Sequence, residues 1–200
     1  MSGGLLRRLR YGAPIVVVSG LPRSGTSMMM RMLAAGGVAP LQDGIRTADV
    51  SNPNGYFEFE PVKGLDKDGD LAWLPAARGK AVKIISFLLT YLPERYDYRV
   101  VFMHRDLDEV LRSQAAMLEQ RGEAAGGDAA QARELYTAHL AQVRRFMAGR
   151  DCFRTLEVDY GAAVKDPAAA AAAVAGFLPR TLDQAKMVAA VDEALYRNRR

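Results

Sequence analysis

Residues 14–33 read PIVVVSGLPRSGTSMMMRML, and this stretch decides the fold that we expect. The β-branched run at 15–18 is too short for a soluble helix and suits a strand that is buried on both faces. Pro22 and Gly25 then interrupt the pattern, and apolar residues at helical spacing follow from Thr26 onward. A strand, a turn of small residues and a helix N-terminus form an anion site, because the first-turn N–H groups and the helix dipole both favour a phosphate.

The turn at residues 20–27, GLPRSGTS, has the spacing of a phosphate-binding loop of the type G-x4-G-K-[ST]. Thr26 stands where that loop has a lysine, which normally reaches the β- and γ-phosphates of a nucleoside triphosphate. Its replacement argues against hydrolysis of ATP or GTP. Arg23 supplies a cation inside the loop. A strand–helix connection without a ligand would not need two glycines, three hydroxyls and an arginine, so the loop suits a phosphate group that is not a magnesium triphosphate.

Length and composition predict one domain. The chain of 200 residues is long enough to bury a sizeable core, and its 50% hydrophobic and 25% charged residues are ordinary for a globular protein. We interpret residues 1–13, which carry three arginines, as a basic N-terminal tail and not as a signal peptide, and residues 14–200 as a single domain. The net charge of +4 fits an anionic ligand without demanding nucleic acid.

The numbers of cysteines and histidines argue against a disulfide-stabilised protein and against a metal-binding protein. Cys152 is the only cysteine, which excludes an intrachain disulfide framework and predicts a cytoplasmic location. The two histidines and this cysteine lack the spacing of metal ligands, so we expect no metal. No apolar run approaches the roughly 20 residues that a membrane span needs.

Apolar strands alternate with amphipathic helices along the rest of the chain. Three further strands are predicted from β-branched and aromatic runs, at 80–87, 98–104 and 153–160. Helices are predicted from apolar residues at helical spacing, beginning near Asp106 or Asp108, at 129–148, after Asp166-Pro167, and at 181–196. This alternation is typical of an α/β fold with a parallel β-sheet flanked by helices. Ligands of such sheets bind outside the carboxyl ends of the strands.

The segment from Phe57 to Glu60 alternates apolar and acidic residues after the turn signal at 52–55. The pattern fits an exposed strand with solvated carboxylates. It fits equally a carboxylate that neighbouring aromatic residues hold near the phosphate loop. The pattern alone leaves both interpretations open.

A second candidate anion site follows the strand at 98–104. Arg105 stands at the carboxyl end of that strand, and Ser113 comes eight residues later, about two turns into the next helix. The two side chains could converge on one anion. The alternatives are a salt bridge from Arg105 to Asp106 or Asp108 and a surface position for Ser113.

The motif PRSGTS after a hydrophobic strand resembles the 5′-phosphosulfate loop of the sulfotransferase family. The segment from Arg105 to Ser113 resembles the family's 3′-phosphate motif, strand–Arg–x–Pro–x–Asp–x3–Ser, with Leu107 in place of proline and with Asp108 and Glu109 covering the acidic position. The resemblance implies a P-loop NTPase-like sulfotransferase fold. It also implies 3′-phosphoadenosine 5′-phosphosulfate (PAPS) as the co-substrate, without a metal.

The resemblance assigns roles to particular residues. Downstream, LEVDYGAAVKDP resembles the family's tyrosine-containing stretch and would bring Tyr160 near the adenine. The C-terminal Arg197 and Arg199 would add late contacts to the 3′-phosphate, or else form a solvated basic tail. The co-substrate-binding residues that the resemblance implies are Arg23, Ser24, Gly25, Thr26, Ser27, Arg105, Ser113, Tyr160 and Arg197.

The implied reaction passes a sulfuryl group from PAPS to an acceptor hydroxyl or amine. Arg23 would stabilise the charge of the leaving group, and Lys83 resembles the lysine that relatives place near the transferred group, with Lys80 as the alternative. The histidine of the family's Lys-x-His is missing here, because Ile85 occupies its position. Other branches use a glutamate after the first helix, and Glu58 in NGYFE fits that placement, with Glu60 as the runner-up.

Two other classes of function compete with this one. A P-loop-type nucleotide or small-molecule kinase would need the lysine that Thr26 replaces and a strand-end aspartate for Mg²⁺. A non-catalytic module that binds adenosine bisphosphate stays open because the base histidine is missing. The acceptor, whether a small molecule, a sugar or a lipid, and the oligomeric state are not encoded in any motif that we identify. Nucleic-acid binding would rest on the arginine-rich termini alone.

Overall fold

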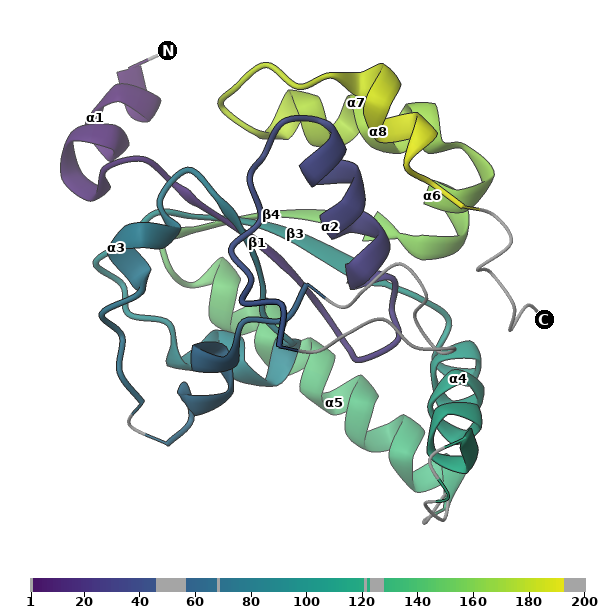
Figure 1. Ribbon diagram of the computed structural model, residues 1–200. Helices are drawn as coiled ribbons and strands as arrows, with labels where there is room; N and C mark the ends of the chain where they lie inside the picture. Colours follow the sequence, from purple (N-terminus) through teal and green to yellow (C-terminus); the bar gives the residue numbers. More distant parts are fainter. Residues whose placement is uncertain (1, 46–56, 68, 121, 123–127, 193–200) are drawn as a thin grey trace.

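The computed structural model describes residues 2–45, 57–67, 69–120, 122 and 128–192. Its centre is a parallel four-stranded sheet in the order β2-β1-β3-β4. The strands are β1 (Ile15–Gly20), β2 (Ala81–Lys83), β3 (Tyr98–His104) and β4 (Phe153–Asp159). The predicted α/β fold with a parallel sheet flanked by helices is confirmed (Figure 1).

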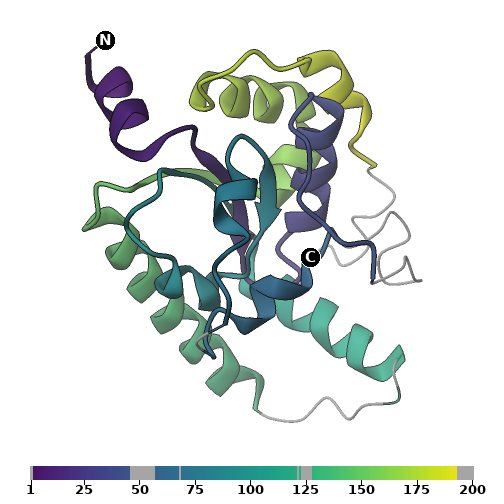
Figure 2. The ribbon, with the colours of Figure 1, turned by 60° about the vertical axis from the view of Figure 1, so that its left-hand side comes forward.

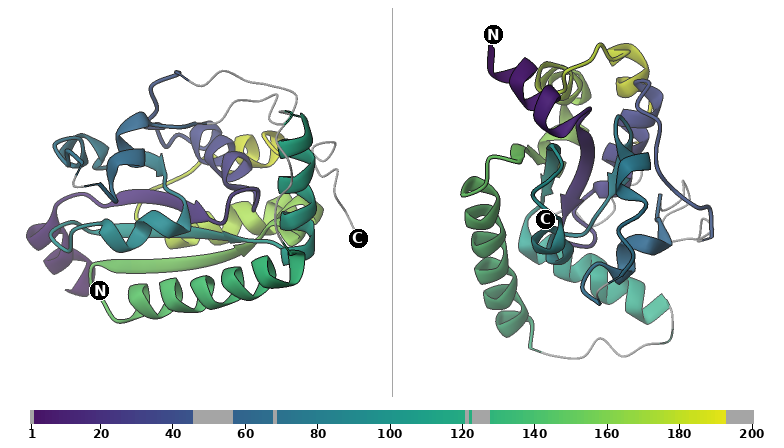
Figure 3. Two further views of the ribbon diagram at one scale, coloured as in Figure 1. Left: turned by 90° about the horizontal axis from the view of Figure 1, so that it is seen from below. Right: turned by 90° about the vertical axis from the view of Figure 1, so that its left-hand side faces the viewer.

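Helices cover both faces of this sheet (Figure 1). One face carries α2 (Thr26–Ala35), α6 (Tyr160–Lys165), α7 (Pro167–Phe177) and α8 (Gln184–Ala189). The other face carries α5 (Ala129–Ala148), α3 (Leu74–Ala77) and the 3₁₀ turns η1 (Glu60–Gly64) and η2 (Ser86–Tyr91). Figure 3 shows α5 lying along the sheet, and α4 (Leu107–Gln120) leads into it from the carboxyl end of β3.

Strand β1 explains why two cores form. Val16 and Val18 belong to the cluster with α2, α6, α7 and α8, whereas Ile15 and Val17 belong to the cluster on the opposite face. Successive side chains of a strand point to opposite faces, so an unbroken apolar run fills both cores. The expectation of a strand buried on both faces is confirmed, since every residue of β1 is buried.

One predicted strand is shorter than expected, and one strand that the sequence left as an open alternative does not form. The strand expected at 80–87 ends at Lys83 and gives way to η2, because β2 is an edge strand whose pairing with β1 stops at the Val18–Lys83 pair. The strand suggested for 57–60 does not form. Phe57 has a φ of 51°, and Pro61 stands in the first turn of η1. Both features end an extended backbone.

The chain ends also differ from expectation. The residues interpreted as a basic tail include helix α1 (Ser2–Tyr11). The last predicted helix, 181–196, is shorter, since α8 ends at Ala189 and residues 193–200 lie outside the described part of the chain. By contrast, β3 and α5 have the predicted bounds of 98–104 and 129–148.

Candidate functional site

The loop between β1 and α2 depends on two glycines. Gly20 has a φ of 143°, and a Cβ there would lie 2.3 Å from the Met103 carbonyl oxygen and 2.4 Å from Ser24 Oγ. Gly25 is the N-cap of α2 in the left-handed region, and its Cβ would lie 2.2 Å from Cδ2 of Tyr160. Neither position has room for a side chain, so the loop is tightly packed against β3 and α6.

Helix α4 holds the loop from the other side. Arg23 Nε donates to Ser113 Oγ at 3.0 Å, and Gln114 Nε2 donates to the Pro22 carbonyl at 3.4 Å. The Tyr136 hydroxyl donates in turn to Gln114 Oε1 at 2.9 Å. Arg23 itself has a φ of 73°, which is a strained backbone for a non-glycine residue and persists only where surrounding contacts fix it. The contacts from α4 provide that support.

The start of α2 has the features of an anion site. No side chain caps this N-terminus among the described residues. Ser24 is buried, and its Oγ has no hydrogen-bond partner within the described part of the chain. A buried hydroxyl without a partner is costly, so a ligand oxygen would satisfy it. Thr26 and Ser27, half-buried in the first turn, complete the predicted loop. These residues fit a phosphate or sulfate group.

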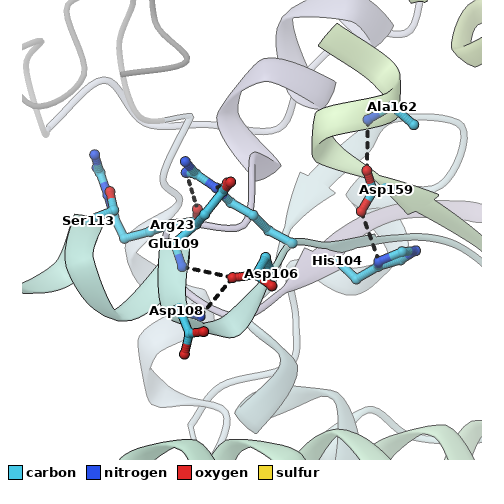
Figure 4. A network of polar contacts seen from close by, with 9 residues as sticks. Arg23, His104, Asp106, Asp108, Glu109, Ser113, Asp159 and Ala162 are labelled. Atoms are coloured by element: carbon cyan, nitrogen blue, oxygen red, sulfur yellow. Dashed lines mark hydrogen bonds and ion pairs between the residues drawn. The ribbon is translucent and has the colours of Figure 1, made fainter. Parts of the chain in front are cut away.

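Arg105 joins the second predicted motif to this loop. Its Nη1 donates to the Arg23 carbonyl at 3.2 Å, and its guanidinium lies 4.7 Å from the centroid of the Tyr160 ring. Its Nε donates to Glu109 Oε2 at 2.8 Å, and both side chains are less than a tenth exposed. Figure 4 shows Arg23, Ser113 and Glu109 together at the start of α4. Arg105 and Ser113 therefore converge on one place, around Arg23.

The salt bridge expected as an alternative for Arg105 has a different acid. Asp106 accepts from the backbone N–H groups of Asp108 and Glu109 at 3.1 and 3.2 Å and so caps α4 (Figure 4). Asp108 pairs with Arg133. The acid that pairs with Arg105 is Glu109. Sequence reasoning had considered Glu109 only together with Asp108, as residues at the acidic position of the 3′-phosphate motif. The signal that could have separated them is the i,i+4 spacing of Glu109 from Arg105, which lies two residues before α4 begins.

Tyr160 lies against the loop. It is buried, and burial raises the pKa of its hydroxyl, an effect that the nearby positive charges of Arg105, Arg31 and Arg23 oppose. Its ring fills the space beside Gly25 that a side chain there would need. Arg31 of α2, which sequence reasoning did not single out, belongs to the same basic cluster. Burial lowers the pKa of Arg31.

The two predicted catalytic side chains from distant segments lie together. Lys83 Nζ is 3.8 Å from Glu58 Oε1, and Lys63 Nζ is 3.7 Å from Glu58 Oε2. The side chains of Lys83 and Glu58 are only 10% and 19% exposed. Lys83 stands at the carboxyl end of β2, in register with Val18 of β1. Glu58 is therefore a held carboxylate and not a solvated one, but the groups that hold it are two lysines, whereas the expectation named aromatic neighbours.

The alternatives to these two residues lie elsewhere. Lys80 precedes β2, and its carbonyl accepts from Val16 at the opposite end of the strand pair. Glu60 is 54% exposed and pairs with Lys63 at 2.8 Å. The geometry thus favours Glu58 and Lys83 over both alternatives as the pair near the loop edge of the sheet.

Comparison with known proteins identifies the fold. No protein-family model matches the sequence, and no curated protein matches it at a significant level. The sulfotransferase domain from the curacin biosynthetic pathway aligns over 92% of this chain and 89% of its own length, with 15% identity and a TM-score of 0.56. A Mycobacterium tuberculosis sulfotransferase aligns over 88% of this chain and 70% of its own length, with 19% identity and a TM-score of 0.55. This chain has the sulfotransferase fold.

The sulfotransferase fold agrees with the resemblance seen in the motifs. Arg197 and Arg199, assigned to the 3′-phosphate on that resemblance, lie outside the described residues. Within the described residues no three acidic, histidine or cysteine side chains gather as metal ligands would. The same part of the chain contains no helix whose length and apolarity would suit a membrane crossing.

Proposed function

We propose that this protein is a sulfotransferase that moves the sulfuryl group of PAPS to an acceptor hydroxyl or amine. The observation that carries the proposal is the junction of the two predicted phosphate motifs. Arg23 bonds Ser113 at 3.0 Å, and Arg105 bonds the carbonyl of Arg23 at 3.2 Å. One basic cluster beside one helix N-terminus suits a nucleotide with two separate phosphate groups.

Each part of the cluster has a role in this proposal. The loop from Ser24 to Ser27, with Arg23, binds the 5′-phosphosulfate and stabilises the charge that develops on the leaving phosphate. Arg105 and Ser113 bind the 3′-phosphate, because a guanidinium fork and a hydroxyl together match phosphate oxygens. Arg197 would add a further contact to that group. Tyr160 supports the loop and borders the adenosine. Like phosphoryl transfer, the reaction depends on positioning and charge stabilisation.

The Glu58–Lys83 pair supplies the acid–base chemistry of the proposal. Glu58 accepts the proton of the acceptor hydroxyl or amine, and Lys83 presents positive charge to the transferred group. Their 3.8 Å separation keeps the carboxylate oriented toward the lysine at the carboxyl end of β2. The acceptor, a small molecule, sugar or lipid, would enter beside this pair.

Binding calorimetry tests the nucleotide site. We expect adenosine 3′,5′-bisphosphate to bind more tightly than ADP in the presence of EDTA. Arg105→Ala should weaken bisphosphate binding by about 30-fold or more, the usual cost of removing one partner of a buried charged contact. Arg144→Ala, which removes a surface arginine paired with Glu157, is the matched control. Magnesium-dependent preference for ADP or ATP, unaffected by Arg105→Ala, would overturn the proposal in favour of a kinase.

Turnover separates the enzyme from a binding module. Release of adenosine 3′,5′-bisphosphate from PAPS would be followed with a panel of sugar, lipid and phenol acceptors. Glu58→Gln should lower the rate by about 100-fold or more, since general base catalysis contributes that much, while bisphosphate binding stays intact. Glu60→Gln is the control and should keep most of the rate. A near-normal rate in Glu58→Gln, or lost binding, would contradict the role of Glu58.

A further inference from the structure

Helix α1 exposes two leucines to solvent and turns one of its arginines, Arg7, toward the rest of the protein. Leu6 and Leu9 are 65% and 76% exposed. On the inward side, Arg7 bonds the buried Asp97 and the carbonyl of Asp151, and Tyr11 is buried. A surface helix normally turns its apolar stripe toward the core, so α1 reverses the usual arrangement. Figures 1 and 2 show α1 at the periphery of the molecule, ahead of β1.

Arginines flank the two leucines on α1. At 100° per residue, Leu6 and Leu9 lie within about 60° of one another on the outward face, with Arg10 on one side and Arg8 on the other. Both arginines are exposed, and Arg10 lies over the ring of Tyr11 at 5.0 Å.

Two more exposed arginines lie beside the helix. Arg78 packs against Gly12, directly after α1, and its guanidinium is 5.0 Å from the ring centroid of Tyr96. Arg95 lies over the same ring at 5.4 Å. Among the described residues, three carboxylates lie in this region: Asp97 is buried and paired with Arg7, Glu94 is paired with Arg150, and Asp151 is exposed. The exposed arginines around the leucines, Arg8, Arg10, Arg78 and Arg95, outnumber these carboxylates.

We propose that α1 binds this protein to the surface of an anionic lipid bilayer. Leucines at the centre of a helix face with arginines at both margins are the pattern of an interfacial helix, in which the apolar side chains enter the headgroup–acyl boundary. The arginines extend toward lipid phosphates at either side, and Arg78 and Arg95 add to the attraction. Charge complementarity selects an anionic bilayer over a neutral one.

The position of α1 keeps the bilayer away from the phosphate loop. Three residues link α1 to the amino end of β1, whereas the loop begins at the carboxyl end of the same strand. A bilayer under α1 thus leaves the carboxyl edge of the sheet in contact with water. The proposal does not depend on the proposed sulfotransferase activity, and its test uses no nucleotide.

Vesicle co-sedimentation tests the proposal. The full chain is mixed with vesicles of phosphatidylcholine alone or with phosphatidylserine added. We expect binding to the anionic vesicles only, with a decrease at high salt because exposed charges are screened. The double variant Leu6→Ser/Leu9→Ser should reduce the vesicle partition coefficient by about tenfold or more, since its leucines no longer bury apolar surface. Leu135→Ser, which changes a 63% exposed leucine of α5, is the matched control.

Three results would overturn the proposal: no binding of the wild-type chain to anionic vesicles, equal binding of the double variant, or equal loss in Leu135→Ser. Sedimentation velocity of the same samples without lipid tests the alternative that a second copy of the chain binds to this face. If the wild type forms a dimer that the double variant does not form, and neither binds vesicles, the leucines serve contact between two copies of the chain. Circular dichroism would show that each variant is folded.

Discussion

Arg105 is held in place before any ligand arrives. Glu109 binds its Nε, the Arg23 carbonyl binds its Nη1, and its guanidinium lies over the ring of Tyr160. A buried arginine carries a large desolvation penalty, which Glu109 offsets by its charge. A phosphate dianion beside Arg105 would bring a second negative charge near Glu109. The Arg105–Glu109 pair therefore contributes to the stability of the protein without ligand, and this contribution should change when a phosphate binds.

Glu109→Gln tests that coupling. The amide keeps a hydrogen bond to Arg105 but leaves the buried guanidinium without an opposite charge. We expect the free energy of unfolding without ligand to fall by about 2–3 kcal/mol, less than the roughly 3–5 kcal/mol of losing one partner of a buried ion pair outright. With saturating adenosine 3′,5′-bisphosphate the deficit should shrink, because the phosphate supplies the missing charge. Urea denaturation with and without the bisphosphate measures both quantities.

The matched control is Glu157→Gln. Glu157 makes a two-pronged contact with Arg144 at 3.0 and 2.9 Å, but both side chains are more than a third exposed. Exposed pairs contribute at most about 1 kcal/mol, and this one lies outside the proposed site. Its effect should be small and the same with or without ligand. A deficit in Glu109→Gln that ligand does not change would refute the coupling.

Sequence reasoning identified most residues of this cluster but not their partners. Arg23, Arg105 and Ser113 follow from their positions after two predicted strands. The Arg105–Glu109 pair was missed because Asp106, Asp108 and Glu109 are all close enough in sequence to pair with Arg105. Which of them does so depends on where the helix begins, and Asp106 fixes that point by capping α4. Arg31 was missed because its neighbour, Tyr160, comes from a distant segment of the chain.

At the scale of single elements, the start of α2 depends on the contact between Gly25 and Tyr160. Gly25→Ala places a Cβ 2.2 Å from the ring at a φ of 99°. We expect it to lower the free energy of unfolding by about 1–3 kcal/mol, the cost of such backbone strain, and to weaken bisphosphate binding as the loop shifts. Thermal denaturation and calorimetry measure the two effects.

Gly176→Ala is the control for this change. Gly176 lies in α7, and a Cβ there would meet no atom within 4 Å. Alanine is the better helix former, so stability should be unchanged or rise by up to about 1 kcal/mol, with binding unaffected. If Gly25→Ala behaved like Gly176→Ala, the loop would not be packed on Tyr160 as described.

The contact between η2 and α5 should make stability depend on pH. Ser86 Oγ and His139 Nε2 share a hydrogen bond of 2.9 Å, and the imidazole stacks on Phe87 with ring centroids 3.8 Å apart. Burial lowers the pKa of His139. Below about pH 6.5, the usual histidine pKa, the unfolded chain binds a proton more readily than the folded one, so stability falls as the pH drops.

His139→Gln isolates this contribution. The amide can still bond Ser86 but has no proton to gain, so we expect the fall in urea midpoint between pH 7.5 and pH 5.5 to be smaller in the variant than in the wild type. The carboxylates of the chain titrate equally in both proteins and cancel in the comparison. Identical pH dependence in the two proteins would show that His139 is not the group responsible.

The elements differ in how well sequence predicts them. β3 pairs on both sides, and its apolar run ends with its pairing, so the bounds 98–104 were predictable. β2 lies at an edge, and Ile84, which follows Lys83, packs into the core although the pairing with β1 has ended. The pattern of apolar residues in the sequence indicates which residues are buried. It does not indicate where an edge strand ends, because that depends on how far the neighbouring strand pairs with it.

At the scale of the whole molecule, strand order creates the site. β1 lies between β2 and β3, so Lys83, the loop after Gly20 and Arg105 leave three adjacent strands at the same edge. The alternation of strands and helices was readable from the sequence, whereas this order was not, because it depends on which β-strands pair across distant parts of the chain. The resemblance of two short motifs to sulfotransferases supplied what the pattern could not.

Because these segments meet only in the folded chain, ligand binding should stabilise the whole molecule. At a free concentration of adenosine 3′,5′-bisphosphate 100 times the dissociation constant, mass action adds about 2.7 kcal/mol. For a domain of this size that corresponds to a rise in melting temperature of about 5–10 °C.

AMP at the same concentration should give a smaller rise, and Arg105→Ala should remove the difference between the two nucleotides, since that difference is the 3′-phosphate. Differential scanning fluorimetry with EDTA present measures all four combinations. Equal shifts with AMP and the bisphosphate in the wild-type protein would mean that Arg105 and Ser113 do not bind a 3′-phosphate.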